Sequence, residues 1–136
     1  MTWAFDVDGT LVGSIRSDVL RPGATELLEA LSARGVDRVL WSAGGADYAR
    51  RMAAAHGIDD MFHAFHAKAE RGADQRYLID HLQTRDDALI FVDDSPVDLP
   101  RGAEIIRVSQ FMGNNPADRA LVDLLNRLDE ILDLDD

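Results

Sequence analysis

The chain has 136 residues, enough for one domain with one hydrophobic core, and 46% of them are apolar. Acidic residues outnumber basic ones by 25 to 14, and the formal charge of −11 argues against broad binding to nucleic acid or to an anionic membrane. The absence of cysteine excludes disulfides and thiolate zinc sites. No signal peptide is visible and no window approaches the roughly 20 apolar residues of a membrane span, so we expect a single cytoplasmic domain over 1–136.

Short apolar runs alternate with amphipathic stretches, a pattern typical of an α/β fold with a mostly parallel sheet. Pro22 suits the first position of a helix, and Gly35 and Gly57 suit helix ends. The acidic tail 133–136 is predicted to fray. The predicted strands are 3–7, 38–41, 62–67, 88–92 and 104–108, and the predicted helices are 22–34, 47–56, 74–82 and 117–132.

Polar residues follow four of the predicted strands at the points where the strands end. In an open parallel sheet, ligands bind beyond the carboxyl ends of the strands, so we expect these residues to converge on one edge. They are Asp6, Asp8 and Thr10 after the first strand, Ser42 and Ala43 after the second, Lys68 after the third, and Asp93 and Asp94 after 88–92.

This set of residues suits phosphoryl transfer. Carboxylates close together repel one another, and an oxygen-only ligand set suits Mg²⁺. With a cation bound, an ionised Asp6 can attack phosphorus to form an aspartyl-phosphate. Asp8 starts on the same side of an extended backbone and can act as general acid and then activate water. The charge on the phosphoryl oxygens needs donors, which we assign to Lys68, Ser42, Thr10 and the backbone of the turn at Ala43.

The four segments together resemble a known superfamily. Asp6-Val7-Asp8-Gly9-Thr10-Leu11 resembles the first motif, DxDGT, of haloacid dehalogenase superfamily phosphatases. Ser42, Lys68 and the segment Asp93-Asp94-Ser95-Pro96 are similar to the second, third and fourth motifs, in the same order. The resemblance implies a Rossmann-like three-layer α/β/α sandwich with a five-stranded sheet of order 5-4-1-2-3. It also implies Mg²⁺ held by Asp6, the Asp8 carbonyl and Asp94, with Asp93 acting through water.

Members of this superfamily differ in the cap domains inserted between their motifs. Here only 13 residues separate Asp8 from Pro22, and only 25 separate Ser42 from Lys68. Neither interval has room for a folded cap, so we expect a capless member. Capless members often act on macromolecules or close their sites by oligomerising, and a homo-oligomer is therefore among the expectations.

A finer resemblance concerns phosphatases that act on the C-terminal domain of RNA polymerase II. Residues 42–49, Ser-Ala-Gly-Gly-Ala-Asp-Tyr-Ala, are similar to their T-A-S-x-x-x-Y-A stretch, and residues 92–96 resemble their V-D-[DN]-S-P. Those enzymes carry a longer insertion between the second and third motifs, and they follow the lysine with Asp-Leu, where this chain has Ala69-Glu70. The substrate therefore stays open between a phosphorylated small molecule and a phosphoprotein.

Simpler interpretations exist for the same residues. Ser42 can cap the next helix, and Lys68 can be a solvated surface charge. Lys68 is, however, the one lysine among 14 basic residues, which favours a role that needs a compact ammonium. A phosphoacceptor module or a non-catalytic subunit competes with a phosphomonoesterase as the function. Asp8 favours hydrolysis, because an acceptor module needs no acid/base group two residues after its acceptor.

Overall fold

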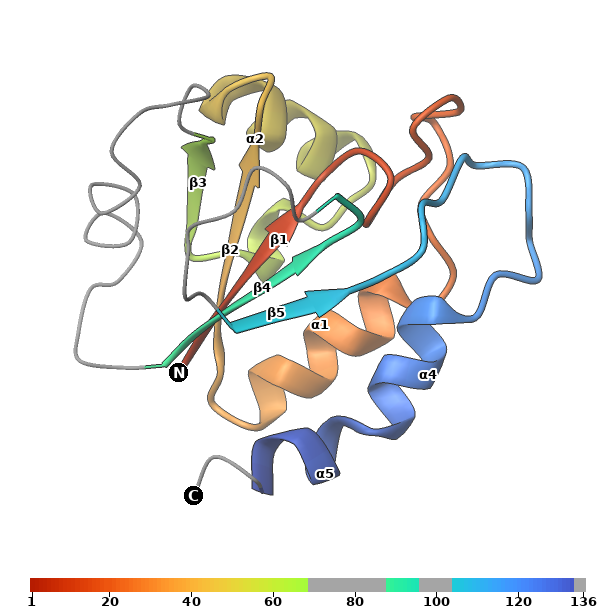
Figure 1. Ribbon diagram of the computed structural model, residues 1–136. Coiled ribbons are helices and arrows are strands. Elements are labelled where there is room, and N and C mark those ends of the chain that lie inside the picture. The colour runs from red at the N-terminus through yellow and green to blue at the C-terminus, as the bar shows by residue number, and fades with distance from the viewer. Residues whose placement is uncertain (69–87, 96–103, 134–136) are drawn as a thin grey trace.

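The computed structural model describes residues 1–68, 88–95 and 104–133. Its centre is a five-stranded sheet in the order β3-β2-β1-β4-β5, with β1 in the middle (Figure 1). Every strand pair is parallel, and the order is the predicted 5-4-1-2-3. The predicted Rossmann-like fold class is thereby confirmed. The strands are β1 (Thr2–Asp6), β2 (Asp37–Ser42), β3 (Ala64–Ala67), β4 (Leu89–Asp93) and β5 (Glu104–Arg107).

The helices of the described ranges share one hydrophobic core with one face of the sheet. Trp3 and Phe5 of β1 belong to this core, whereas Ala4, between them, belongs to a smaller cluster on the opposite face. Burial on both faces is typical of strands in a parallel sheet. The predicted helix 74–82, which would supply the third layer, lies outside the described residues. The helices are α1 (Ala24–Ala33), α2 (Ala46–Ala55), the 3₁₀ helix η1 (Asp59–Met61), α4 (Ala120–Asn126) and α5 (Leu128–Asp133), and α1 and α4 lie side by side in Figure 1.

The glycines predicted at two helix ends have that role. Gly35 has a φ of 72°, and the N–H groups of Gly35 and Val36 donate to carbonyls in the last turn of α1. Gly57, with a φ of 71°, closes α2 in the same way. A residue without a side chain adopts this left-handed conformation most readily. The prediction for Pro22 was wrong, because α1 begins at Ala24 after Gly23, and Pro22 precedes the helix.

The single helix predicted over 117–132 is also corrected. The chain forms α4 and α5, separated at Arg127, whose N–H donates to the carbonyl of Leu124 at 3.1 Å. This contact closes a tightened last turn, which lets Leu124 and Leu128 both stay buried across the break. The apolar spacing is the same for a continuous and a broken helix, so the pattern did not predict the break. Asp133 is still helical, and the rest of the tail lies outside the described ranges.

The connections at the carboxyl edge of the sheet carry no inserted domain where the structure describes them. The chain runs from β1 to α1 through residues 7–23, and the segment between β2 and β3 contains α2 and η1. The prediction of a capless core is confirmed. None of the helices in the described ranges is long and apolar enough to cross a membrane.

Candidate active site

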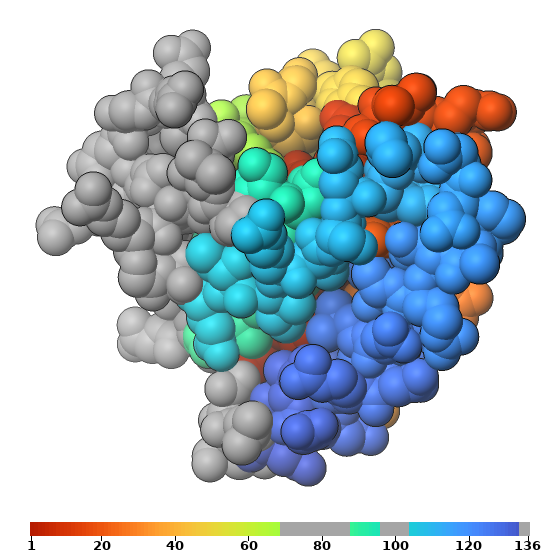
Figure 2. Space-filling view, turned by 45° about the vertical axis from the view of Figure 1, so that its right-hand side comes forward, coloured from red at the N-terminus to blue at the C-terminus, as the bar shows by residue number. Residues whose placement is uncertain are grey.

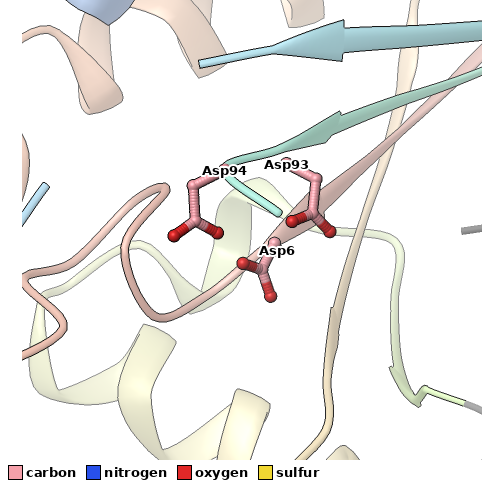
Figure 3. Close-up of side chains that lie close together, drawn as sticks. All are labelled: Asp6, Asp93 and Asp94. Atoms are coloured by element: carbon pink, nitrogen blue, oxygen red, sulfur yellow. The ribbon is translucent and has the colours of Figure 1, made fainter. Parts of the chain in front are cut away.

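Three carboxylates meet at the carboxyl ends of the two central strands. Asp6 is the last residue of β1, Asp93 is the last residue of β4, and Asp94 follows it. Each offers an oxygen within 4.8 Å of the others, and Figure 3 shows the three side chains gathered at this edge. Pairing of β1 with β4 places Phe5 beside Val92 and thereby brings the two strand ends together. The sheet topology therefore produces the predicted convergence.

Lys68 lies between two of these carboxylates. Its Nζ is 2.8 Å from Asp6 Oδ1 and 3.0 Å from Asp93 Oδ2, and its side chain is 12% exposed. The backbone N–H of Lys68 donates to the carbonyl of Ser42, which extends the pairing of β2 with β3 by one residue. The Trp41 ring also lies beneath the ammonium, with 5.3 Å from Nζ to the ring centre. The interpretation of Lys68 as a solvated surface charge does not fit this position.

The charges of this cluster do not balance. Burial raises the pKa of Asp6 to about 7, although the Lys68 ammonium acts in the opposite direction. Burial also raises the pKa of Asp93, although the hydrogen bond from the Ser95 N–H and the charge of Lys68 both act to lower it. Burial acts to lower the pKa of Lys68, but the charges of Asp6 and Asp93 outweigh it and raise that pKa. Among the residues that the structure describes, one ammonium faces three carboxylates, so this group has negative charge that a bound cation would offset.

The turn after β1 is shaped for the approach of Asp94. Gly9 has a φ of 83°, and a Cβ at this position would collide with the Asp94 carboxylate. The neighbouring Thr10 is fully buried, and its hydroxyl lies 3.2 Å from Asp6 Oδ2 and 3.4 Å from Asp94 Oδ1. The predicted phosphate-binding hydroxyl of Thr10 is thus engaged with the carboxylates in this structure.

Ser42 is buried at the end of β2, and Ala43 is exposed in the turn that follows. The Ser42 hydroxyl accepts a hydrogen bond from the N–H of Gly44 at 3.0 Å. Helix α2 begins after its N-cap residue Gly45, and no side chain makes a capping hydrogen bond to its first turn. The interpretation of Ser42 as the cap of that helix is therefore wrong. Its hydroxyl instead stabilises the turn that presents the backbone of Ala43 at the sheet edge.

Asp8 has a partner of its own. The Tyr48 hydroxyl, on α2, donates a hydrogen bond to Asp8 Oδ1 at 2.7 Å. Burial, and then the bond to Asp8, raise the pKa of Tyr48 to about 12, so this phenol stays protonated near neutral pH. The sequence signal for Tyr48 is its match to the Y-A pair of the second motif stretch, and that match does not reveal the contact with Asp8.

A buried arginine that was not predicted from the sequence supports the turn after β1. Arg21 is 1% exposed and pairs with Asp118, with 2.8 Å from Nε to Oδ1. Its remaining donors reach the carbonyls of Gly9 and Thr10 and the hydroxyl of Ser109. Nothing in the sequence separates Arg21 from the arginines on the surface, because its partner lies 97 positions further along the chain.

The loop after the first motif is tied to the segment that follows β5. The N–H groups of Ser14, Ile15 and Arg16 donate to carbonyls of Phe111 and Met112, and Phe111 in turn donates to the carbonyl of Gly9. In Figure 2 the red-orange atoms of this loop lie against light-blue atoms of the later segment. These two loops form one wall beside the Asp6 turn, with the side chains of Ile15 and Met112 exposed on it.

The parallel sheet, its strand order and the acidic group beyond β1 and β4 are those expected of a phosphatase of the haloacid dehalogenase type, and the described connections carry no cap. The chain belongs to the NLI interacting factor-like phosphatase family, whose family model matches residues 1–136. The resemblance seen in the sequence motifs is confirmed. No curated protein sequence gives a significant match.

Solved structures with the same fold have low sequence identity. An uncharacterized protein from Listeria monocytogenes serotype 4b is 17% identical, with a TM-score of 0.70 over 98% of this chain and 99% of that chain. The core domain of a putative phosphoglycolate phosphatase from Streptococcus pneumoniae is 22% identical, with a TM-score of 0.63 over 96% of this chain and 95% of that chain. At these identities the likeness establishes the fold alone.

Proposed function

We propose that this phosphatase is a Mg²⁺-dependent phosphomonoesterase that works through an aspartyl-phosphate on Asp6. The observation that carries the proposal is the position of Asp6. Its carboxylate is paired with Lys68 at 2.8 Å and lies within 4.8 Å of Asp93 and Asp94 at the open edge of the sheet. This arrangement supports Asp6 as the nucleophile, Lys68 as a phosphate-binding cation and the carboxylates as metal ligands.

The residues present fit Mg²⁺. The donors are carboxylate oxygens, which are the ligands that this ion prefers, and Gly9 leaves the room that Asp94 occupies. Asp6, Asp94 and the Asp8 carbonyl would hold the ion. Asp93, whose two oxygens accept bonds from Lys68 and from the Ser95 N–H, would act through water. When bound, Mg²⁺ supplies the positive charge that offsets the phosphate and carboxylate charges.

The first chemical step uses Asp6 and Asp8. A carboxylate oxygen of Asp6 attacks phosphorus, the bond from phosphorus to the leaving oxygen breaks, and Asp8 donates the proton that the leaving oxygen takes up. Lys68, the Ser42 hydroxyl and the backbone N–H of the turn at Ala43 bind the phosphoryl oxygens as their charge develops. Thr10 keeps the second oxygen of Asp6 oriented through its hydroxyl, at 3.2 Å.

The second step returns the site to its starting state. Water attacks the phosphorus of the aspartyl-phosphate, Asp8 accepts the proton from that water, and the bond from phosphorus to Asp6 breaks to release inorganic phosphate. The substrate is a phosphate monoester, either a small molecule or a phosphoprotein. The net charge of −11 disfavours nucleic acid.

The test is Asp6→Asn with Mg²⁺ and p-nitrophenyl phosphate. Turnover is expected to fall by a factor on the order of 10³ or more, while circular dichroism and melting temperature stay close to those of the unchanged protein. Asp47→Asn is the matched control, because Asp47 is an exposed aspartate of α2 with 92% side-chain exposure. Undiminished turnover in Asp6→Asn would rule out the mechanism. In the unchanged protein, stoichiometric phosphorylation of Asp6 without repeated turnover would indicate a phosphoacceptor module instead.

A further inference from the structure

A hydrogen bond joins Tyr48 to the carboxylate of Asp8. Asp8 follows β1 and Tyr48 lies in the first turns of α2, 40 positions further on, and the hydroxyl donates to Oδ1 at 2.7 Å. Asp8 and Tyr48 are both only partly buried. The Asp8 carboxylate is not part of the group formed by Asp6, Asp93 and Asp94.

The turn after β2 makes room for the Tyr48 ring. A Cβ at Gly44 would lie 2.9 Å from Cδ1 and 3.1 Å from Cγ of Tyr48, which is closer than side-chain carbons pack. Gly44 is not among the glycines with positive φ, so its backbone does not itself require glycine. What requires glycine at this position is the approach of the Tyr48 ring. The N–H of Gly44 also donates to the Ser42 hydroxyl, which fixes the turn.

We propose that Tyr48 is a positioning residue that holds Asp8 for proton transfer, with Gly44 providing the space for its ring. A carboxylate free to rotate presents either oxygen in many directions. One that accepts a short bond at Oδ1 has its plane restrained and offers Oδ2 to the substrate or to water. The inference rests on the proposed role of Asp8 as general acid and base.

The dependence of kcat/KM on the leaving group of the substrate tests this proposal. A poor leaving group such as an alkoxide needs a proton from Asp8, whereas 2,4-dinitrophenolate departs without one. Tyr48→Phe is expected to lower kcat/KM for an alkyl phosphate about tenfold, the effect of one hydrogen bond to a charged group, and to lower it less than about twofold for 2,4-dinitrophenyl phosphate. KM is expected to stay nearly unchanged, because the hydroxyl binds Asp8 and not the substrate.

Gly44→Ala provides a second variant that keeps the hydroxyl but displaces the ring. It is expected to show the same selective loss on the alkyl phosphate. In the Tyr48→Phe background the added Cβ should have little further selective effect, because the bond it would disturb is already gone. Any disturbance of the Ser42 turn would lower kcat/KM for both substrates alike and so is separated from the Asp8 effect.

Asp8→Asn separates the failure of this proposal from the failure of the proposed function. If Asp8→Asn shows a large selective loss on the alkyl phosphate and Tyr48→Phe shows none, Tyr48 does not position Asp8. An equal loss on both substrates, or a change confined to KM, would also overturn the role of Tyr48. If Asp8→Asn itself shows no selectivity for the leaving group, Asp8 is not the general acid, and the role of Tyr48 falls with it, whereas the nucleophilic role of Asp6 is tested separately by Asp6→Asn.

Discussion

Gly9 and Asp94 occupy a space that admits only one side chain. The turn after β1 brings position 9 so close to the carboxylate of Asp94 that a Cβ there would overlap it. The same glycine has a φ of 83°, and its carbonyl accepts bonds from Phe111 and Arg21. The missing side chain in the first motif thus sets the position of an acidic residue in the fourth.

Gly9→Ala should therefore affect metal binding as well as stability. The Asp94 carboxylate has to move, so we expect the rise in melting temperature on adding Mg²⁺ to be largely lost. Gly35→Ala is the matched control, because Gly35 has a φ of 72° with no atom within 4 Å of an added Cβ. It should lose roughly 1–2 kcal/mol of stability from backbone strain and keep its full response to Mg²⁺. Equal responses to Mg²⁺ in the two variants would contradict this prediction.

Lys68→Met should make the protein more dependent on a cation. The Lys68 Nζ lies 2.8 Å from Asp6 and 3.0 Å from Asp93, so removing the ammonium leaves both carboxylates without this partner. We expect a lower melting temperature without metal, a larger rise on adding Mg²⁺, and a loss of turnover of about 10²-fold or more. Arg119→Met removes a charge from an exposed pair with Asp123 and should change none of these quantities. A Lys68→Met protein as stable without metal as the unchanged one would contradict the charge argument.

Arg21→Met should destabilise the fold strongly. The change leaves Asp118 without its partner and removes donors from the carbonyls of Gly9 and Thr10. Removing one partner of a buried ion pair costs about 3–5 kcal/mol. We expect a loss of this size in the free energy of unfolding, measured by urea denaturation. Combining it with Asp118→Leu should recover part of the loss. Arg16→Met, in a pair whose side chains are 61% and 70% exposed, is expected to change stability by less than about 1 kcal/mol.

Ser42→Ala should weaken the binding of phosphate without unfolding the protein. The hydroxyl is buried at the end of β2 and accepts the N–H of Gly44. Without it we expect competitive inhibition by inorganic phosphate to weaken about tenfold, as for loss of a hydrogen bond to a charged group. Ser32→Ala, at an exposed position of α1, serves as the control. An unchanged inhibition constant in Ser42→Ala would remove Ser42 from the phosphate-binding set.

Much of the fold could be predicted because it depends on local patterns. The apolar run 88–92 predicted β4, which spans Leu89–Asp93, and Gly35 and Gly57 correctly predicted two helix ends. The convergence of Asp6, Lys68, Asp93 and Asp94 followed from a topological rule, since residues after parallel strands meet at one edge. The break at Arg127 escaped prediction, because an amphipathic pattern has the same spacing on both sides of it.

The sequence by itself determined the α/β class, the family and the residues that gather at the site, because strand periodicity and short motifs are local properties. Only the tertiary structure decided how those residues are held. Tyr48 reaches Asp8 across 40 positions, and Arg21 reaches Asp118 across 97. Asp94 fills the place of a side chain at Gly9. Contacts between residues so far apart arise from the packing of the whole chain, and no local pattern in the sequence contains them.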